Sequence, residues 1–259
     1  MLDISIDNRG VAQMLLNAPD KHNILTPEMI AALTDAAKTL GADPAVRVVV
    51  LTGVGRSFCA GGDLAWMQRM IASDDETRKI GARKLAAMLQ ALNTMPKPLI
   101  GRIQGQAFGG GVGMMCVCDM AIGVTGAQFG LTETKLGVTP ATISPYVIAR
   151  MGEARARRVF MSSRRFDAGE AVALNLLAAV VEPDQLDAAV EVEIAAYLQC
   201  APGAVAAAKA LARSLGPVID DAVIDMSVAS LVDRWGSQEI KEGLAAFFEK
   251  RDANWVVKS

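Results

Sequence analysis

Two glycine-rich segments of this chain could supply hydrogen-bond donors to a reacting oxygen. One is Phe58–Asp63, which reads FCAGGD, and the other contains Gly109–Gly111. Glycines that open a helix leave free backbone N–H groups, and the helix dipole adds positive potential there. If the two segments face each other, they could direct two N–H groups at one developing oxyanion. Equally, the glycines could serve only close packing of helices on a sheet.

The chain lacks the residues that several other common enzyme chemistries require. His22 is the single histidine, and no Ser or Cys lies in a nucleophile-elbow context, which disfavours a histidine-based hydrolase. Neither glycine segment has the pattern of a Rossmann fingerprint or a P-loop. Cys116 and Cys118 lie in an apolar helical run and point to different faces, so we interpret them as buried, inert thiols. We expect no metal and no separate cofactor.

Alternating strands and helices must position these segments. A hairpin is predicted over residues 2–7 and 11–16, and a buried strand over 46–52. The segments 53–62 and 105–111 are predicted to be loops that lead into helices, which indicates parallel strands with crossovers. Gly41 is predicted to end the helix that begins after Thr26. From about Ala168 onward the pattern is almost entirely helical, with helices expected over 186–200, 204–215, 221–235 and 238–251.

The composition is that of a globular protein. The 259 residues are 52% hydrophobic and 21% charged, with a net charge of −2, which indicates no general affinity for nucleic acid or an anionic membrane. No apolar run reaches the roughly 18 residues of a membrane span, and the N-terminus lacks the basic and apolar regions of a secretory signal. We therefore expect a cytoplasmic protein.

The order of the motifs resembles that of the crotonase (enoyl-CoA hydratase/isomerase) superfamily. Besides the two glycine segments, the resemblance includes FGLTETKLGVTP at 129–140, RFDAGEAVALNLL at 165–177 and EGLAAFFEKR at 242–251. It implies an α/β fold made of a spiral of ββα units, over residues 1–195, with a helical C-terminal oligomerisation region over 196–259. It also implies an acyl-CoA thioester as substrate and a homo-oligomer, either a trimer or a dimer of trimers.

The resemblance assigns catalytic roles to three residues. The backbone N–H groups of Gly62 and Gly110 would bind the thioester carbonyl oxygen and stabilise an enolate, and Glu133 would be the general acid/base. In an apolar pocket the pKa of Glu133 could rise toward neutrality. The alternative for Glu133 is an exposed loop residue paired with Lys135.

One departure from the family pattern affects the expected reaction. Many hydratases of the family carry a second glutamate where this chain has Gly113. A single carboxylate is compatible with hydration if the activated water supplies the second proton, but it favours isomerisation of a 3-enoyl to a 2-enoyl thioester on chemical grounds. Thr142 or Ser144 could position the water instead, although Ser144-Pro145 could simply begin a helix. Gly113 could also leave room for a branched acyl group.

Substrate contacts follow from the same resemblance. It places coenzyme A near Lys21, Ala60 and Leu64, with Phe247 and Lys250 reaching coenzyme A on a neighbouring subunit. The acyl wall would be formed by residues at helical spacing that could equally be ordinary core, namely Trp66, Met67 and Met70.

Residues 109–161 look similar to bacterial hydratases of methylglutaconyl-type and isohexenylglutaconyl-type thioesters. The predicted function is therefore an enoyl-CoA hydratase acting on a branched or glutaconyl-type acyl group. A glutaconyl-type substrate would need a cation, for which Arg69 and Arg102 are candidates. Two alternatives stay open, a one-base isomerase and an inactive acyl-CoA-binding paralogue.

Overall fold

Six strands form the larger of two sheets in the computed structural model, which describes residues 1–257. In spatial order they are β1 (Leu2–Ile6), β2 (Val11–Leu16), β3 (Val48–Gly53), β5 (Leu99–Ile103), β7 (Met120–Val124) and β10 (Ala179–Val181). Only the β1–β2 pair is antiparallel, and the other neighbours are parallel. Strand β3 is buried along its whole length, as its run of β-branched residues predicts.

Four short strands form a second sheet that the sequence does not predict. Their order is β4 (Ser57–Cys59), β6 (Gln106–Phe108), β8 (Gln128–Gly130) and β9 (Arg165–Asp167), with only β9 antiparallel to its neighbour. The pairs β3–β4, β5–β6 and β7–β8 each place one strand in the large sheet and the next in the small one. The chain therefore winds as a spiral through both sheets.

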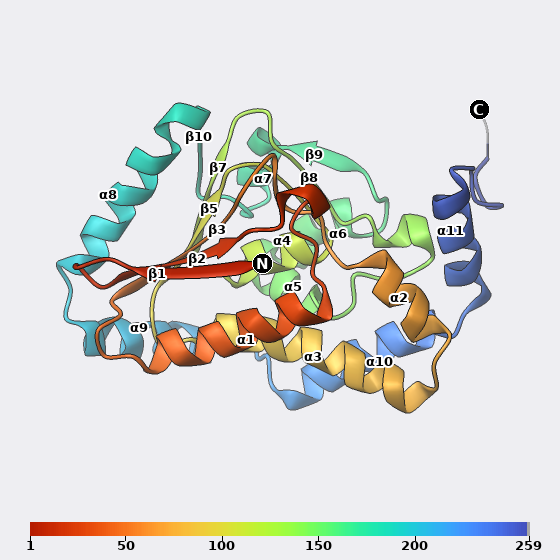
Figure 1. Ribbon diagram of the computed structural model, residues 1–259, viewed down its shortest axis with the longest axis horizontal. Coiled ribbons are helices and arrows are strands. Elements are labelled where there is room, and N and C mark those ends of the chain that lie inside the picture. Colours follow the sequence, from red (N-terminus) through yellow and green to blue (C-terminus); the bar gives the residue numbers. More distant parts are fainter. Residues whose placement is uncertain (258–259) are drawn as a thin grey trace.

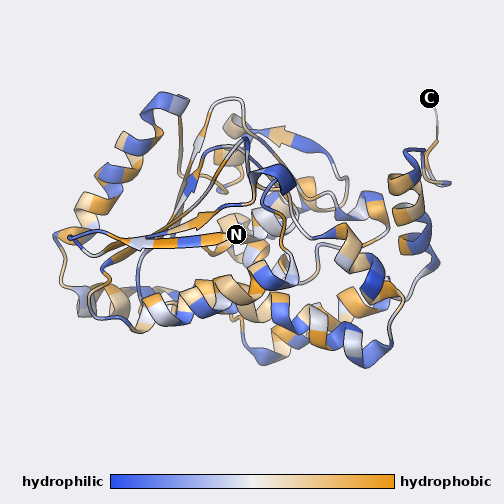
Figure 2. Cartoon of the chain, in the orientation of Figure 1, coloured by the Kyte–Doolittle hydropathy of each residue, from blue (hydrophilic) through white to orange (hydrophobic). Residues whose placement is uncertain are grey.

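Helices cover the sheets and extend the molecule at its C-terminal end. They are α1 (Pro27–Ala42), α2 (Leu64–Ile71), α3 (Asp75–Thr94), α4 (Gly110–Val117), α5 (Ser144–Met151), α6 (Glu153–Phe160), α7 (Ala168–Ala173), α8 (Leu186–Leu198), α9 (Pro202–Leu215), α10 (Asp221–Trp235) and α11 (Gln238–Glu249), with short 3₁₀ turns η1 (Pro19–Lys21), η2 (Glu133–Leu136) and η3 (Pro183–Gln185). Figure 1 shows α1, α3 and α10 together along one side, and α11 at the end opposite α8. Along α1 and α3, apolar and polar residues are interspersed (Figure 2), and the buried residues of α1 recur at helical spacing.

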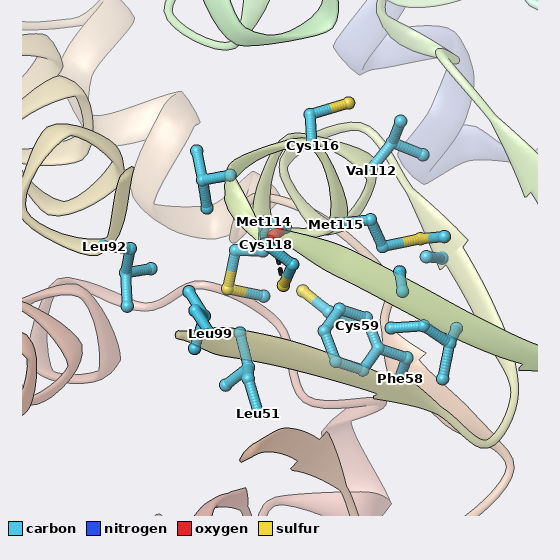
Figure 3. Close-up of a cluster of buried hydrophobic side chains, with 14 of the residues drawn as sticks. Leu51, Phe58, Cys59, Leu92, Leu99, Val112, Met114, Met115, Cys116 and Cys118 are labelled. Atoms are coloured by element: carbon cyan, nitrogen blue, oxygen red, sulfur yellow. Dashed lines mark hydrogen bonds between the residues drawn. The ribbon is translucent and has the colours of Figure 1, made fainter. Parts of the chain in front are cut away.

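Helix α4 is the buried centre of the fold. Seven of its eight residues are buried, which explains why it is apolar on every side. Met114, Met115 and Cys118 lie beside Phe58 and Leu51 of the neighbouring strands (Figure 3). The prediction that Cys116 and Cys118 are buried is confirmed. Burial also raises the pKa of each thiol to about 12, which disfavours the reactive thiolate.

Several details of the predicted secondary structure are wrong. Gly41 lies inside α1, which continues to Ala42. The segments predicted as loops at 53–62 and 105–111 contain β4 and β6, and β10 interrupts the region after Ala168 that was predicted to be helical. These strands have only three residues each, too few to show an alternating pattern. The predicted α/β class is confirmed, while the boundary between 195 and 196 stays a prediction.

The C-terminal helices have a hydrophobic cluster of their own. Helices α10 and α11 contribute Val228, Leu231, Trp235, Ile240 and Leu244, which pack on α3 and on the segment after η2. Across residues 1–257, no helix is by itself both long and apolar enough to cross a membrane. Residues Pro183–Leu198 and Pro202–Leu215 pass that test only as a pair, bent by 104° at their break.

Candidate active site

The small sheet brings the two glycine segments together. Strands β4, β6 and β8 are parallel neighbours, so their carboxyl ends lie at one edge. Ala60–Gly62 follows β4, Gly109 and Gly110 follow β6, and Glu133 follows β8. Gly109 N–H also donates to Gly130 O at 2.9 Å, which joins the second loop to the strand before Glu133. All three predicted catalytic elements therefore lie at the same end of one sheet.

The N–H groups of Gly62 and Gly110 are neighbours without hydrogen-bond acceptors among residues 1–257. A Cβ on Gly61 would lie 3.6 Å from Gly110 N, and one on Gly110 would lie 3.9 Å from Gly62 N. The backbone groups on either side of the Gly62 N–H are already hydrogen-bonded to Leu25. The Leu25 N–H donates to Gly61 O, and the Leu25 carbonyl accepts from Asp63 N–H. Gly110 is also the first residue of α4, where the helix dipole favours negative charge. Two unpaired backbone N–H groups therefore lie close together, as the prediction of an oxyanion hole requires.

Glu133 lies in a low-dielectric position. Its side chain is half-buried, and its Oε2 is fully buried with no hydrogen-bond partner in the described part of the chain. Burial raises the pKa of Glu133 from its ordinary value of 4.5 to about 7, and a hydrogen bond from its own backbone N–H acts in the opposite direction. Lys135 is exposed, and no ion pair found among residues 1–257 joins it to Glu133. The alternative of an exposed Glu133 paired with Lys135 is therefore wrong.

Gly109 fixes how close Glu133 comes to the oxyanion loop. A Cβ at Gly109 would lie 2.9 Å from Glu133 Oε1, and the backbone of Gly109 has a φ of +50°. Only glycine combines that backbone conformation with so close an approach. The carboxyl group therefore packs directly on the chain that carries one of the N–H donors.

A cavity of about 560 Å³ joins these groups. Of the ten site residues predicted from sequence, nine line it: Ala60, Gly62, Leu64, Trp66, Gly110, Glu133, Thr142, Phe247 and Lys250. Lys21 is exposed on η1 and is not among the lining residues, so its proposed contact with coenzyme A stays a prediction. Met67 also lines the cavity, whereas Met70 does not and lies near Gly81 instead.

Sequence reasoning missed the part of the wall that comes from distant elements. Leu85 of α3 and Leu231 and Trp235 of α10 also line the cavity. The Trp235 ring meets Trp66 edge to face, with ring centroids 5.8 Å apart. No motif marks these residues, because helix packing alone brings them to the site.

The candidate cations for a substrate carboxylate are different from those expected. Arg102 donates to Asp187 Oδ1 at 2.6 Å, and neither it nor Arg69 lines the cavity. The cationic residues that line the cavity are instead Lys135, Arg165, Lys250 and Arg251. The Arg165 guanidinium lies 5.0 Å from the centre of the Phe108 ring.

Ile143 fills the space beside Gly113. A Cβ at Gly113 would lie 2.4 Å from Ile143 Cγ2 and 3.7 Å from Leu89 Cδ2. The expectation that Gly113 leaves room for a branched acyl group is therefore wrong. The space of the missing glutamate is taken by hydrocarbon. Among the described residues that line the cavity, the carboxylates are Glu133 and Asp252.

We expect Gly113→Ala to lower the free energy of unfolding by about 2 kcal/mol, because overpacking forces Ile143 to move. Urea denaturation would measure the change. Gly203→Ala is the matched control, since no atom lies within 4 Å of a Cβ at that position in α9. An equal or smaller loss in Gly113→Ala than in the control would show that the space is open.

Thr142 and Ser144, the two hydroxyls considered for water positioning, behave differently. Thr142 lines the cavity, and its hydroxyl makes no hydrogen bond with residues 1–257; because this hydroxyl is not among the fully buried atoms that lack a partner, it is accessible from the cavity. Ser144 Oγ donates to Ala141 O at 2.6 Å and begins α5, as the simpler interpretation of Ser144-Pro145 expects. His22 Nδ1 lies 3.0 Å from Ser57 Oγ, which agrees with its interpretation as a loop hydrogen-bonding residue.

Known proteins of similar sequence and structure belong to one enzyme family. Residues 7–258 match the enoyl-CoA hydratase/isomerase family. The chain is 33% identical to the crotonyl-CoA hydratase of Syntrophomonas wolfei, covering 96% of this chain and 95% of that protein. It is 30% identical to the mevalonyl-coenzyme A hydratase of Aspergillus fumigatus, with coverage of 97% and 93%. The crystal structure of an enoyl-CoA hydratase from Shewanella pealeana matches with a TM-score of 0.80 and 38% identity, over 98% of this chain and 95% of that one.

Proposed function

The chain belongs to the enoyl-CoA hydratase/isomerase family, and we propose that it is an enoyl-CoA hydratase that adds water across the 2,3 double bond of an acyl-CoA thioester. The observation that carries this proposal is the position of Glu133. Its buried carboxyl lies against Gly109, beside the two free N–H groups of the glycine loops. A base and an oxyanion hole thus meet in one cavity.

The proposed mechanism uses Glu133 twice. The Glu133 carboxylate takes a proton from a water molecule, whose oxygen bonds to the β carbon. The electron pair of the double bond moves toward the thioester, and the Gly62 and Gly110 N–H groups stabilise the resulting enolate oxygen. Glu133 then returns the proton to the α carbon. The sum is one water added, and no second carboxylate is needed. A pKa near 7 suits a group that must both accept and donate a proton at neutral pH.

An isomerase is the second candidate, and the surroundings of Gly113 favour it. Ile143 occupies the space in which a second carboxylate would lie, and moving a proton from the α to the γ carbon needs only Glu133. Purified protein assayed in parallel with crotonyl-CoA, 3-methylglutaconyl-CoA and a 3-enoyl-CoA separates the candidates. Loss of enoyl absorbance with hydroxyacyl-CoA confirmed by mass supports the hydratase, whereas gain of absorbance from the 3-enoyl ester alone supports the isomerase.

The third candidate function is that of an inactive acyl-CoA-binding protein. In that case each ester would bind and none would be converted. The retained Glu133, Gly62 and Gly110, all lining one cavity, argue for catalysis.

Thr142 is proposed to hold the water that Glu133 activates. Thr142→Val keeps the shape and removes the hydroxyl, so we expect kcat for hydration to fall about tenfold, with little change in KM. Any conversion of a 3-enoyl ester should be unaffected, because that reaction uses no water. Thr139→Val is the control, since Thr139 lines the same cavity but its Oγ1 pairs with Ser230 Oγ at 3.4 Å. Equal losses in both variants would remove Thr142 from the mechanism.

The finer part of the proposal concerns the acyl group, coenzyme A and assembly. The similarity of residues 109–161 to hydratases of glutaconyl-type thioesters supports a branched or glutaconyl-type acyl group, for whose carboxylate Lys135 and Arg165 are available in the cavity. Phe247 and Lys250 line the cavity of their own chain, which supports a contact with coenzyme A there, whereas their contact with coenzyme A on a neighbouring subunit stays a prediction. We further propose a trimer or a dimer of trimers, which the family resemblance supports and sedimentation would test.

A further inference from the structure

Residues 22–25, called the anchor segment below, lie against the first glycine segment, residues 58–63. Three backbone hydrogen bonds join the two segments: Ala60 N–H to His22 O at 3.0 Å, Leu25 N–H to Gly61 O at 2.8 Å and Asp63 N–H to Leu25 O at 3.4 Å. None of these bonds uses the Gly62 N–H, which has no acceptor within residues 1–257. The proposed mechanism uses that N–H but gives the anchor segment no role.

The hydrogen bond from Leu25 sets the direction of the Gly62 N–H. Gly61 O and Gly62 N–H belong to one peptide unit, which is trans and planar, so its C=O and N–H point in opposite directions. Because Leu25 N–H binds Gly61 O, the Gly62 N–H points away from the Leu25 backbone. The Leu25 side chain also lies beside the second loop, since a Cβ on Gly110 would be 2.7 Å from Leu25 Cδ1.

Asn23 fixes the anchor segment to the rest of the fold. Its side chain is fully buried, and its Nδ2 donates to Val54 O at 3.0 Å and to Ser57 O at 2.9 Å. Its Oδ1 accepts from Ala18 N–H at 2.8 Å. The φ of Asn23 is +53°, in the left-handed region that asparagine enters more readily than most residues. The amide therefore joins the anchor segment to the turn between β3 and β4, just before the glycine segment.

We propose that Asn23 is a positioning residue of the oxyanion hole, because it holds the anchor segment where Leu25 directs the Gly62 N–H. The inference rests on the proposed function and deepens it by naming the residue that sets the direction of one donor. An oxyanion hole is effective only if its donors are already held in place when the charge develops. The Gly61-Gly62 peptide has no side chains that could hold it, so the support must come from outside the loop.

The variant Asn23→Gly removes the amide and permits the same left-handed backbone. Ser57 O keeps a hydrogen bond from Gln104 Nε2 at 2.9 Å, so the turn stays supported while the anchor segment is released. We expect kcat to fall about tenfold or more with KM within a few-fold of wild type, because the donor acts mainly on the transition state. Asn175→Gly is the matched control, since Asn175 has a φ of +62° and an exposed side chain without a hydrogen bond among residues 1–257.

The carbonyl stretching frequency of a bound ester reports on the donors without turnover. Infrared difference spectra would follow hexanoyl-CoA that carries an isotope label on its thioester carbonyl, a saturated ester that cannot be hydrated. We expect wild type and Asn175→Gly to shift the stretch to lower frequency than in the free ester, and Asn23→Gly to lose much of that shift. If Asn23 only stabilised the fold, the folded variant would keep the full shift.

A second variant tests the inference if Asn23→Gly does not fold. An ester bond in place of the Leu25 N–H deletes the donor to Gly61 O and keeps every side chain. We expect this ester to reduce the carbonyl shift, whereas an ester at Ile24, whose N–H donates to Lys21 O at 3.3 Å, should not.

The outcomes separate this inference from the proposed function. A full carbonyl shift in folded Asn23→Gly or in the Leu25 ester would overturn the inference alone. No shift in the wild-type protein would overturn the oxyanion hole and the inference with it. Hydration of crotonyl-CoA by the wild-type protein, measured separately, tests the hydratase activity itself.

Discussion

Replacing Glu133 with glutamine is expected to lower kcat by about a thousandfold while leaving acyl-CoA affinity within a few-fold of wild type. Glutamine keeps the size of the side chain that packs on Gly109, but it cannot take a proton from water or return one to the α carbon. Steady-state kinetics with the best substrate would measure kcat, and titration with a saturated acyl-CoA would measure affinity. Glu28→Gln, an exposed change on α1, is the control. Retained turnover in Glu133→Gln would remove this residue from the mechanism.

The pH dependence of the wild-type enzyme should report on the same group. Because the reactive form is the carboxylate and the pKa of Glu133 is raised to about 7, kcat/KM for hydration should rise with pH through about 7. The residual activity of Glu133→Gln should lack this step. A wild-type profile that is flat between pH 5 and 9 would contradict a buried Glu133 base.

The raised pKa also predicts how stability changes with pH. The folded protein holds the Glu133 proton more tightly than the unfolded chain, so the carboxyl destabilises the fold progressively as pH rises from 4.5 through about 7. At pH 8, Glu133→Gln should therefore be more stable than wild type, by as much as ~3 kcal/mol. Below pH 4 the two proteins should be equally stable. Burial of Glu133 thus lowers the free energy of unfolding at neutral and higher pH while it brings the pKa of the proposed acid/base near 7.

Replacing Gly109 with alanine is expected to lower kcat by about a hundredfold or more. The added Cβ would lie 2.9 Å from Glu133 Oε1, and the φ of +50° is unfavourable for alanine. Glu133 and the loop that carries the Gly110 N–H must therefore move apart. A loss of kcat with a folded circular dichroism spectrum would locate the defect at the active site.

Gly126→Ala separates the effect of a positive φ from the effect of the close contact with Glu133. Gly126 also has a positive φ, +79°, but no atom lies within 4 Å of its Cβ position. We expect this variant to lose some stability and no activity. If Gly109→Ala behaves in the same way, the close contact between Gly109 and Glu133 has no catalytic importance.

Some elements of the fold follow from local sequence patterns, and others do not. The long helices and the buried strand β3 follow from local patterns, and the structure has them near their predicted bounds. The strands β4, β6 and β8 do not follow from such patterns, because three residues show no period and their pairing partners lie about 20 to 50 residues away in the chain. Their parallel pairing nevertheless decides that both glycine loops and Glu133 meet.

The sequence by itself determined which chemical groups this protein offers to a substrate. Backbone N–H groups at glycine loops and one carboxylate at a family position are local facts, and the predicted roles of Gly62, Gly110 and Glu133 depended on them. Only the tertiary structure decided the environment of those groups. Burial of Glu133, the filling of the Gly113 site by Ile143 and the arrival of Trp235 at the cavity all depend on segments distant in sequence. A residue's type sets which protons and hydrogen bonds it can offer, whereas its pKa, neighbours and available space are set by packing.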